Sequence, residues 1–249
     1  MAKKTNYSYV GISFIILVFG IIFIPRIVER FQSGDIARNK RMSKENVEDK
    51  RVSDSEKLMF LEINGEPKKV PSFSFKNQDG KTITDKDYLG KVYVVEFFFT
   101  TCPSICPKMN ANLIQIQNSF KTYKDFGVAS FTINPKHDTS EVLKAYVDKY
   151  GVTNPNWNML TGDKDAIYEL ANIGFNIFAG QNDEVEGGFE HSGNFALIDK
   201  NGFIRSRIHQ GNPIIFYNGI ISEAEQTDED GLKQQITMLK EDIKNLLNE

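Results

Sequence analysis

The chain has 249 residues, and its 30 basic and 33 acidic side chains give a net charge of −3 at pH 7. Charges of both signs are mixed along the sequence and form no basic stripe, so we expect no nucleic acid among its partners. The length suits one sizeable domain with appendages.

The first 30 residues predict a transmembrane anchor. The run from Val10 to Ile24 is apolar except for glycine and one serine, and with its flanks it is long enough to cross a bilayer. Lys3 and Lys4 precede this run, so the positive-inside rule places the N-terminus in the cytoplasm. A cleaved signal peptide is the alternative, but residues 25–30 lack the small-x-small pattern of a cleavage site. We therefore expect a single-pass protein of the inner (cytoplasmic) membrane, with its soluble domain on the extracytoplasmic, periplasmic side.

Residues 31–60 are predicted to form a charged tether. From Ser33 to about Lys57 the chain is rich in charged residues, serine and asparagine and nearly free of aromatic residues, a composition that cannot bury a core. The folded domain is therefore expected over residues 61–249, including a C-terminal helix.

The centre of this domain alternates strands with helices. Residues 92–99 are β-branched and aromatic, which is typical of a strand buried on both faces. A helix is expected over 103–124, with Pro103 at its first position, where a missing N–H costs nothing. A strand over 128–133 follows, and then a helix opened by the capping-box-like segment Asp138–Glu141. This order predicts a βαβα unit with a parallel sheet.

Shorter patterns flank this unit. Before it, residues 71–84 predict a hairpin with its turn at Asp79-Gly80. After it, the sequence predicts in order a strand at 157–160, a helix from Asp163, a Gly-rich loop over 174–193, a hairpin around 199–202, and a last helix marked by Leu232, Ile236, Leu239, Ile243 and Leu246. The last helix is expected to pack on the sheet, with a groove in a partner as a minor alternative.

The position of the two cysteines completes the fold prediction. A cysteine pair after the first strand of a βαβ unit, followed by a closing hairpin and a covering helix, is the element order of the thioredoxin-like fold. We therefore predict an α/β protein: a thioredoxin-like mixed sheet with helices on both faces, preceded by the transmembrane anchor.

Cys102 and Cys106 are expected at a helix N-terminus, where the helix dipole favours the thiolate form. In a regular helix their Cα atoms would lie roughly 6 Å apart, so both a disulfide and a shared metal ion are possible. A purely stabilising disulfide is the simpler alternative, but a loop of three residues removes little entropy from the unfolded chain. In an oxidising compartment, a pair that must stay reduced needs a thiol reductant as partner.

The three histidines differ in their expected roles. His137 lies in a strand-to-helix loop and His209 follows a hairpin strand, so a cap and a surface position explain them. His191 lies in the loop before the strand at Phe195, which in thioredoxin-like folds comes beside the cysteine helix. Two thiolates and one imidazole suit copper, whereas zinc usually takes a fourth ligand. We therefore predict a copper site, Cu(I) or Cu(II), that includes His191.

Three segments carry a family resemblance: Phe97–Pro107, Phe131–Glu141 and Glu190–Ser192. With them, residues 65 to 210 and the anchor resemble the Sco/SenC copper proteins, which help to assemble the copper centre of cytochrome c oxidase. The resemblance implies that Cys102, Cys106 and His191 bind copper. It also implies that the domain delivers copper to cytochrome c oxidase subunit II, or keeps the cysteines of that subunit reduced, outside the membrane.

This chain departs from the family at two positions near the expected site. The family usually has Asp where Ser104 stands, and Asp-Pro where this chain has Asn134-Pro135. Neutral side chains there are expected to alter copper affinity, partner choice and redox potential.

Two enzymatic functions compete with a metallochaperone. A thiol–disulfide oxidoreductase would use Cys102 and Cys106 as its redox pair, but such enzymes usually separate the cysteines by two residues and place Trp where Thr101 stands. A thiol peroxidase usually has Thr where this chain has Phe99. The sequence therefore predicts a membrane-anchored copper chaperone, with the oxidoreductase as the alternative.

Overall fold

The computed structural model describes Leu17, Phe19, residues 58–209 and residues 212–249. Apart from Leu17 and Phe19, the predicted anchor lies outside the described residues, as does most of the predicted tether. Within the described residues, no helix is both long and apolar enough to cross a membrane. The helices and strands named below all lie within residues 58–249.

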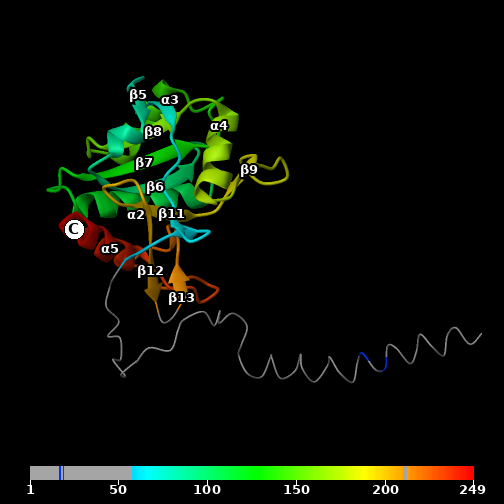
Figure 1. Ribbon diagram of the computed structural model, residues 1–249. Helices are drawn as coiled ribbons and strands as arrows, with labels where there is room; N and C mark the ends of the chain where they lie inside the picture. The colour runs from blue at the N-terminus through cyan, green and yellow to red at the C-terminus, as the bar shows by residue number, and fades with distance from the viewer. Residues whose placement is uncertain (1–16, 18, 20–57, 210–211) are drawn as a thin grey trace, which may run out of the picture. The chain divides into compact units, whose positions relative to one another are not determined.

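Three parallel strands form the centre of a mixed sheet (Figure 1). They are β6 (Val92–Phe98), β7 (Phe126–Thr132) and β8 (Trp157–Thr161), and β7 pairs with both of the others. Every residue of β6 and β7 is buried, as expected for strands that are covered on both faces. The predicted parallel βαβ arrangement is confirmed.

Antiparallel strands extend this centre on both sides. β11 (Asn194–Ile198) pairs with β6, and β12 (Ile204–His209) pairs with β11. Beyond β8 lie β4 (Ser74–Asn77) and β5 (Thr82–Thr84). Both predicted hairpins are therefore confirmed.

Short elements complete this unit. They are β1 (Met59–Phe60), β2 (Glu62–Ile63), β3 (Glu66–Pro67), the 3₁₀ helix η1 (Asp85–Tyr88), β13 (Asn212–Ile214) and β14 (Tyr217–Asn218). Because β1 pairs with β12, regular structure begins within the last residues that the sequence assigns to the tether.

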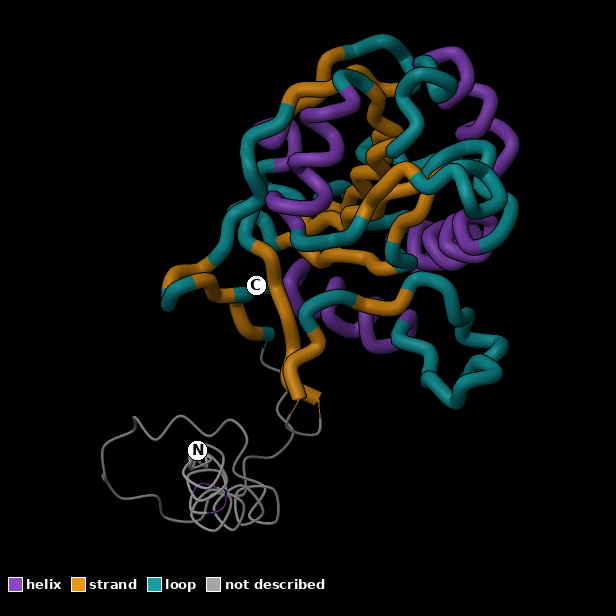
Figure 2. Tube along the Cα trace, turned by 90° about the vertical axis from the view of Figure 1, so that its right-hand side faces the viewer, coloured by secondary structure: helices purple, strands orange, loops and turns teal. Residues whose placement is uncertain are grey.

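Helices cover both faces of the sheet (Figure 2). They are α2 (Ile105–Ser119), α3 (Ser140–Tyr150), α4 (Lys164–Glu169), the π-helix η2 (Leu170–Phe175) and α5 (Ile236–Asn248). The Phe98 ring packs with its centroid 5.5 Å from that of Tyr146 in α3, whereas the Phe97 centroid lies 5.8 Å from that of Phe175 in η2. Successive strand residues point to opposite faces, so α3 and η2 lie on opposite sides of β6.

Three predicted helix boundaries were wrong. Ser104 occupies the cap position of α2, so the helix begins at Ile105, and Pro103 lies outside it. The helix also ends at Ser119, because the chain turns at Phe120, whose ring packs against Phe126. The last helix begins at Ile236, and Leu232 precedes it with 58% of its surface exposed.

The segment 174–193 is not a simple loop, which corrects the sequence-based expectation. It contains an antiparallel pair of strands, β9 (Ala179–Gln181) and β10 (Phe189–His191). Each strand has only three residues, too few to show the alternation that identifies a strand in a sequence. This β9–β10 hairpin is the element that carries His191.

Candidate metal centre

The two cysteines lie where β6 gives way to α2. The chain turns after β6, with the Cys102 N–H donating to the Phe99 carbonyl at 3.2 Å, and Cys106 follows in the first turn of α2. Cys106 is fully buried, Cys102 is half-buried, and both thiols are free. The helix N-terminus predicted for the pair is therefore present, although Cys102 lies just ahead of the helix.

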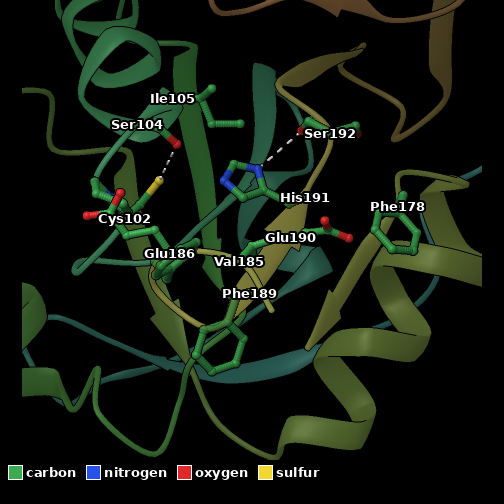
Figure 3. A pocket seen from close by; sticks show the side chains of 12 residues that line it. Cys102, Ser104, Ile105, Phe178, Val185, Glu186, Phe189, Glu190, His191 and Ser192 are labelled. Atoms are coloured by element: carbon green, nitrogen blue, oxygen red, sulfur yellow. Dashed lines mark hydrogen bonds between the residues drawn. The ribbon is translucent and has the colours of Figure 1, made fainter. Parts of the chain in front are cut away.

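His191 reaches the cysteines from the β9–β10 hairpin. Its Nε2 atom lies 3.1 Å from the Cys106 Sγ. Its Nδ1 atom lies 3.2 Å from the Ser192 carbonyl oxygen, a contact drawn in Figure 3. Because a carbonyl oxygen can only accept, that contact assigns the ring proton to Nδ1. The Nε2 lone pair of the neutral ring then faces the sulfur, which is the orientation a metal ligand needs.

The three side chains together form a metal-binding geometry. One ligand atom from each of Cys102, Cys106 and His191 lies within 4.8 Å of the others. His137 is not in this group, because its Nδ1 lies 2.8 Å from the Asp138 Oδ1, and His209 is exposed at the end of β12. The structure thus brings together the three side chains that the sequence selects as ligands. The group could hold a copper ion, since two thiolates and one imidazole are soft ligands.

The two thiols have opposite electrostatic environments. A hydrogen bond from the Cys106 thiol is the largest cause that lowers the pKa of Cys102, to about 3. The backbone N–H of Cys106 also donates to the Cys102 sulfur at 3.4 Å. Burial, together with the neighbouring Cys102 sulfur, raises the pKa of Cys106. Without a metal, Cys102 is therefore the thiolate and Cys106 retains its proton.

A cavity of about 470 Å³ opens beside the cysteine and histidine side chains (Figure 3). Besides Cys102 and His191, apolar and acidic side chains of the hairpin region line it: Phe178, Val185, Glu186, Phe189 and Glu190. A ligand from another molecule can therefore approach the half-buried Cys102 without any rearrangement of the core.

Aromatic packing holds the hairpin against the cysteine loop. The Phe99 ring packs 5.3 Å from the Phe189 ring and edge-on to the His191 imidazole, with centroids 5.9 Å apart. Gly187 adopts a φ of 92°, and a Cβ there would lie 3.1 Å from the Phe99 ring and 3.2 Å from the Pro103 ring. The two segments therefore approach closely enough to require a glycine at this position.

Of the two departures from the family pattern, only Ser104 contacts a cysteine. The Ser104 hydroxyl is 4.0 Å from the Cys102 Sγ, so a neutral group stands beside the thiolate. Asn134 belongs to the turn after β7, where its carbonyl accepts hydrogen bonds from the His137 and Asp138 N–H groups. Neither residue interrupts the arrangement of the three candidate ligands.

The sequence interpretation missed a buried acid in β6 that acts on the pair electrostatically. Glu96 is fully buried in β6, where it accepts a hydrogen bond of 2.6 Å from the Ser130 hydroxyl. Burial raises the pKa of Glu96 to about 7, and its charge in turn helps to raise the pKa of Cys106. The signal was a single Glu within an otherwise apolar strand.

The fold and the candidate site together define a thioredoxin-like domain that carries a Cys-Cys-His group beside an open cavity. The SCO1/SenC family model matches residues 62–224, more than half of the chain. The chain therefore belongs to the SCO1/SenC family.

Individual relatives agree with this assignment. The SCO1 protein homolog of Bacillus subtilis (strain 168) is 31% identical over 156 residues, which are 62% of this chain and 80% of that protein. A SCO1/SenC family lipoprotein from Bacillus anthracis has a solved structure with 32% identity and a TM-score of 0.58, covering 72% of this chain and 94% of that one.

Two further solved structures of Sco proteins are similar to this chain. BsSco, described as a member of the Sco family of cytochrome c oxidase assembly proteins with a disulfide switch, has 27% identity, a TM-score of 0.57, and coverage of 72% and 94%. Bradyrhizobium japonicum ScoI, solved with copper bound, has 20% identity, a TM-score of 0.53, and coverage of 71% and 98%. At 20% identity the second likeness supports the fold alone.

Proposed function

We propose that this protein is a copper chaperone that holds copper through Cys102, Cys106 and His191. The observation that carries the proposal is the convergence of these three ligand atoms within 4.8 Å, in a chain of the SCO1/SenC family. Two sulfurs and one imidazole nitrogen match the ligand preference of copper.

Copper is the cargo of this site, and its binding requires both thiols to be deprotonated. Cys102 is already a thiolate, because the hydrogen bonds around it hold its pKa at about 3. Cys106 must release its proton to the solvent, because the His191 Nε2 atom, 3.1 Å from its sulfur, is itself a proposed ligand and needs its lone pair for the metal. Binding therefore displaces one proton from the pair.

Release requires ligand exchange with an acceptor. The half-buried Cys102 faces the cavity, whereas Cys106 is fully buried, so an incoming cysteine replaces Cys102 first. We assign the acceptor as cytochrome c oxidase subunit II during assembly. This acceptor fits a family that includes a described oxidase assembly protein.

The proposed cellular setting follows from the sequence. Residues 1–30 anchor the chain in the inner (cytoplasmic) membrane, 31–60 form the tether, and 61–249 form the domain on the extracytoplasmic side. A thiol reductant there keeps the cysteine pair able to bind copper, since an oxidised pair cannot ligate a metal.

The test is an anaerobic copper titration of the reduced full-length protein, with a chromophoric chelator as competitor. His191→Ala and Cys102→Ser are each expected to weaken copper binding by more than about 100-fold. This exceeds the loss found when a residue that only orients a ligand is removed. His209→Ala, a histidine exposed at the end of β12, is the matched control and should bind as the wild type does. Unchanged affinity in His191→Ala together with Cys102→Ser would rule out this site.

A thiol–disulfide oxidoreductase is the second candidate, and the asymmetry of the two thiols favours it. The Cys102 thiolate would attack a partner disulfide, forming a mixed disulfide and releasing one partner thiolate. Cys106 would then lose its proton and attack the Cys102 sulfur, releasing the second partner thiolate. The pair is oxidised by two electrons and the partner disulfide is reduced by two. Rapid metal-free disulfide exchange without measurable copper affinity would favour this function over the chaperone.

A further inference from the structure

Asp138 has a different role from the one its place in the sequence predicts. The sequence pattern assigns it to the start of α3, but the cap of that helix is Thr139, whose hydroxyl accepts from the Val142 N–H at 3.4 Å. The Asp138 side chain turns instead toward the cysteine loop and is fully buried. A buried carboxyl is costly unless its oxygens are hydrogen-bonded.

Both carboxyl oxygens of Asp138 have partners. Oδ2 accepts from the Thr100 N–H at 3.0 Å and from the Thr132 hydroxyl at 2.5 Å. Oδ1 accepts a short hydrogen bond from the Thr100 hydroxyl and lies 2.8 Å from the His137 Nδ1. Of these contacts, two involve the same residue, Thr100, through its backbone and its side chain.

Thr100 is the point at which the cysteine loop is held. Cys106 belongs to α2 and His191 to β10, so regular structure sets the backbone of both. Cys102 belongs to neither a helix nor a strand, and its backbone contact is the turn to Phe99. Thr100 lies within that turn, so the double contact to Asp138 determines where the turn places Cys102.

We propose that Asp138 is a positioning residue for Cys102, which through Thr100 fixes the loop that sets the Cys102 sulfur against Cys106 and His191. For copper binding, this inference rests on the function proposed above. The same geometry also governs how readily the two thiols form a disulfide, because the effective concentration of two groups depends on how well each is held. The inference therefore has a consequence that needs no metal.

The test compares Asp138→Ala, Asp138→Asn and Thr100→Val with Thr139→Ala in the reduced full-length protein. Thr139→Ala is the matched control, because it removes the cap of α3 and leaves the contacts of Asp138 to Thr100 in place. Copper affinity is expected to fall by about 10- to 100-fold in Asp138→Ala, the range for partners that orient a ligand. The amide variant, which retains an acceptor oxygen, should recover part of that loss, and Thr139→Ala should bind as the wild type does.

The metal-free readout is the equilibrium of the Cys102–Cys106 disulfide in glutathione buffers. Asp138→Ala and Thr100→Val should both lower its stability, by about tenfold, because a loosely held Cys102 has a lower effective concentration at Cys106. Near-UV circular dichroism confirms that each variant is folded, and Thr100→Val decides the question if Asp138→Ala does not fold. The inference is overturned if folded variants keep the wild-type disulfide equilibrium, or if Thr139→Ala shifts it equally. If the wild type does not bind copper, the proposed chaperone function is refuted. The disulfide equilibrium then tests the role of Asp138 by itself.

Discussion

The Nε2 atom of His191 lies 3.1 Å from the Sγ atom of Cys106, although 85 residues separate the two in the chain. The contact joins the first turn of α2 to the last residue of β10. Its length depends on the packing of the β9–β10 hairpin against Phe99. Changes in that packing are therefore expected to act on the metal centre without removing any ligand.

Gly187 and Gly188 provide a matched test of that packing. Both have positive φ, so alanine at either position strains the backbone by about 1 kcal/mol. Only at Gly187 would the new methyl group meet Phe99 and Pro103, since a Cβ at Gly188 has no atom within 4 Å. We expect Gly187→Ala to weaken copper binding by about tenfold, because the methyl group displaces the hairpin that orients His191. Gly188→Ala should leave copper binding nearly unchanged. Equal affinities in the two variants would show that the hairpin does not control the site.

The thiolate at Cys102 depends on Cys106. Hydrogen bonding to the Cys106 thiol is the largest cause holding the pKa of Cys102 at about 3. Cys106→Ala should therefore raise the pKa of Cys102 toward the ordinary value of a thiol, about 8.5. The rate of Cys102 alkylation by iodoacetamide should stay high down to pH 5 in the wild type and fall steeply below pH 8 in the variant. Identical pH profiles would contradict this account of the low pKa.

Glu96 should make the stability of the fold depend on pH. Burial raises its pKa from 4.5 to about 7, so the folded chain retains a proton that the unfolded chain releases over this interval. This contribution to stability is complete below about pH 4.5 and is lost as the pH rises to about 7. At 1.36 kcal/mol per pKa unit, the loss is about 3 kcal/mol.

Urea unfolding of Glu96→Gln across pH 4 to 8 measures this effect. The neutral amide cannot ionise, so the free-energy difference between the wild type and the variant should shift by about 3 kcal/mol in favour of the variant as the pH rises. Glu66→Gln, a change at an exposed side chain in β3, is the control and should reproduce the wild-type pH profile. A constant difference between wild type and Glu96→Gln would contradict the raised pKa.

Patterns of a few neighbouring residues correctly predicted strands and tight turns, whose formation depends on those residues. The apolar run at 92–98 became a strand buried on both faces, and Gly80 and Gly202 formed the expected turns with φ of 71° and 81°. Boundaries were less predictable, because Pro103 suits a first helical position by itself but lies outside α2. The transmembrane anchor at 1–30 stays a prediction, since almost all of it lies outside the described residues.

The sequence by itself determined the order of strands and helices along the chain, the cysteine pair after the first parallel strand, and the choice of His191 over His137 and His209. Strand and turn patterns act over a few residues, which is why a linear pattern is enough to identify them. Only the tertiary structure decided that His191 sits on a hairpin, that Asp138 turns away from α3 toward Thr100, and that Glu96 is buried. These features arise from contacts between segments far apart in the chain, and burial of a polar side chain appears only when those segments meet.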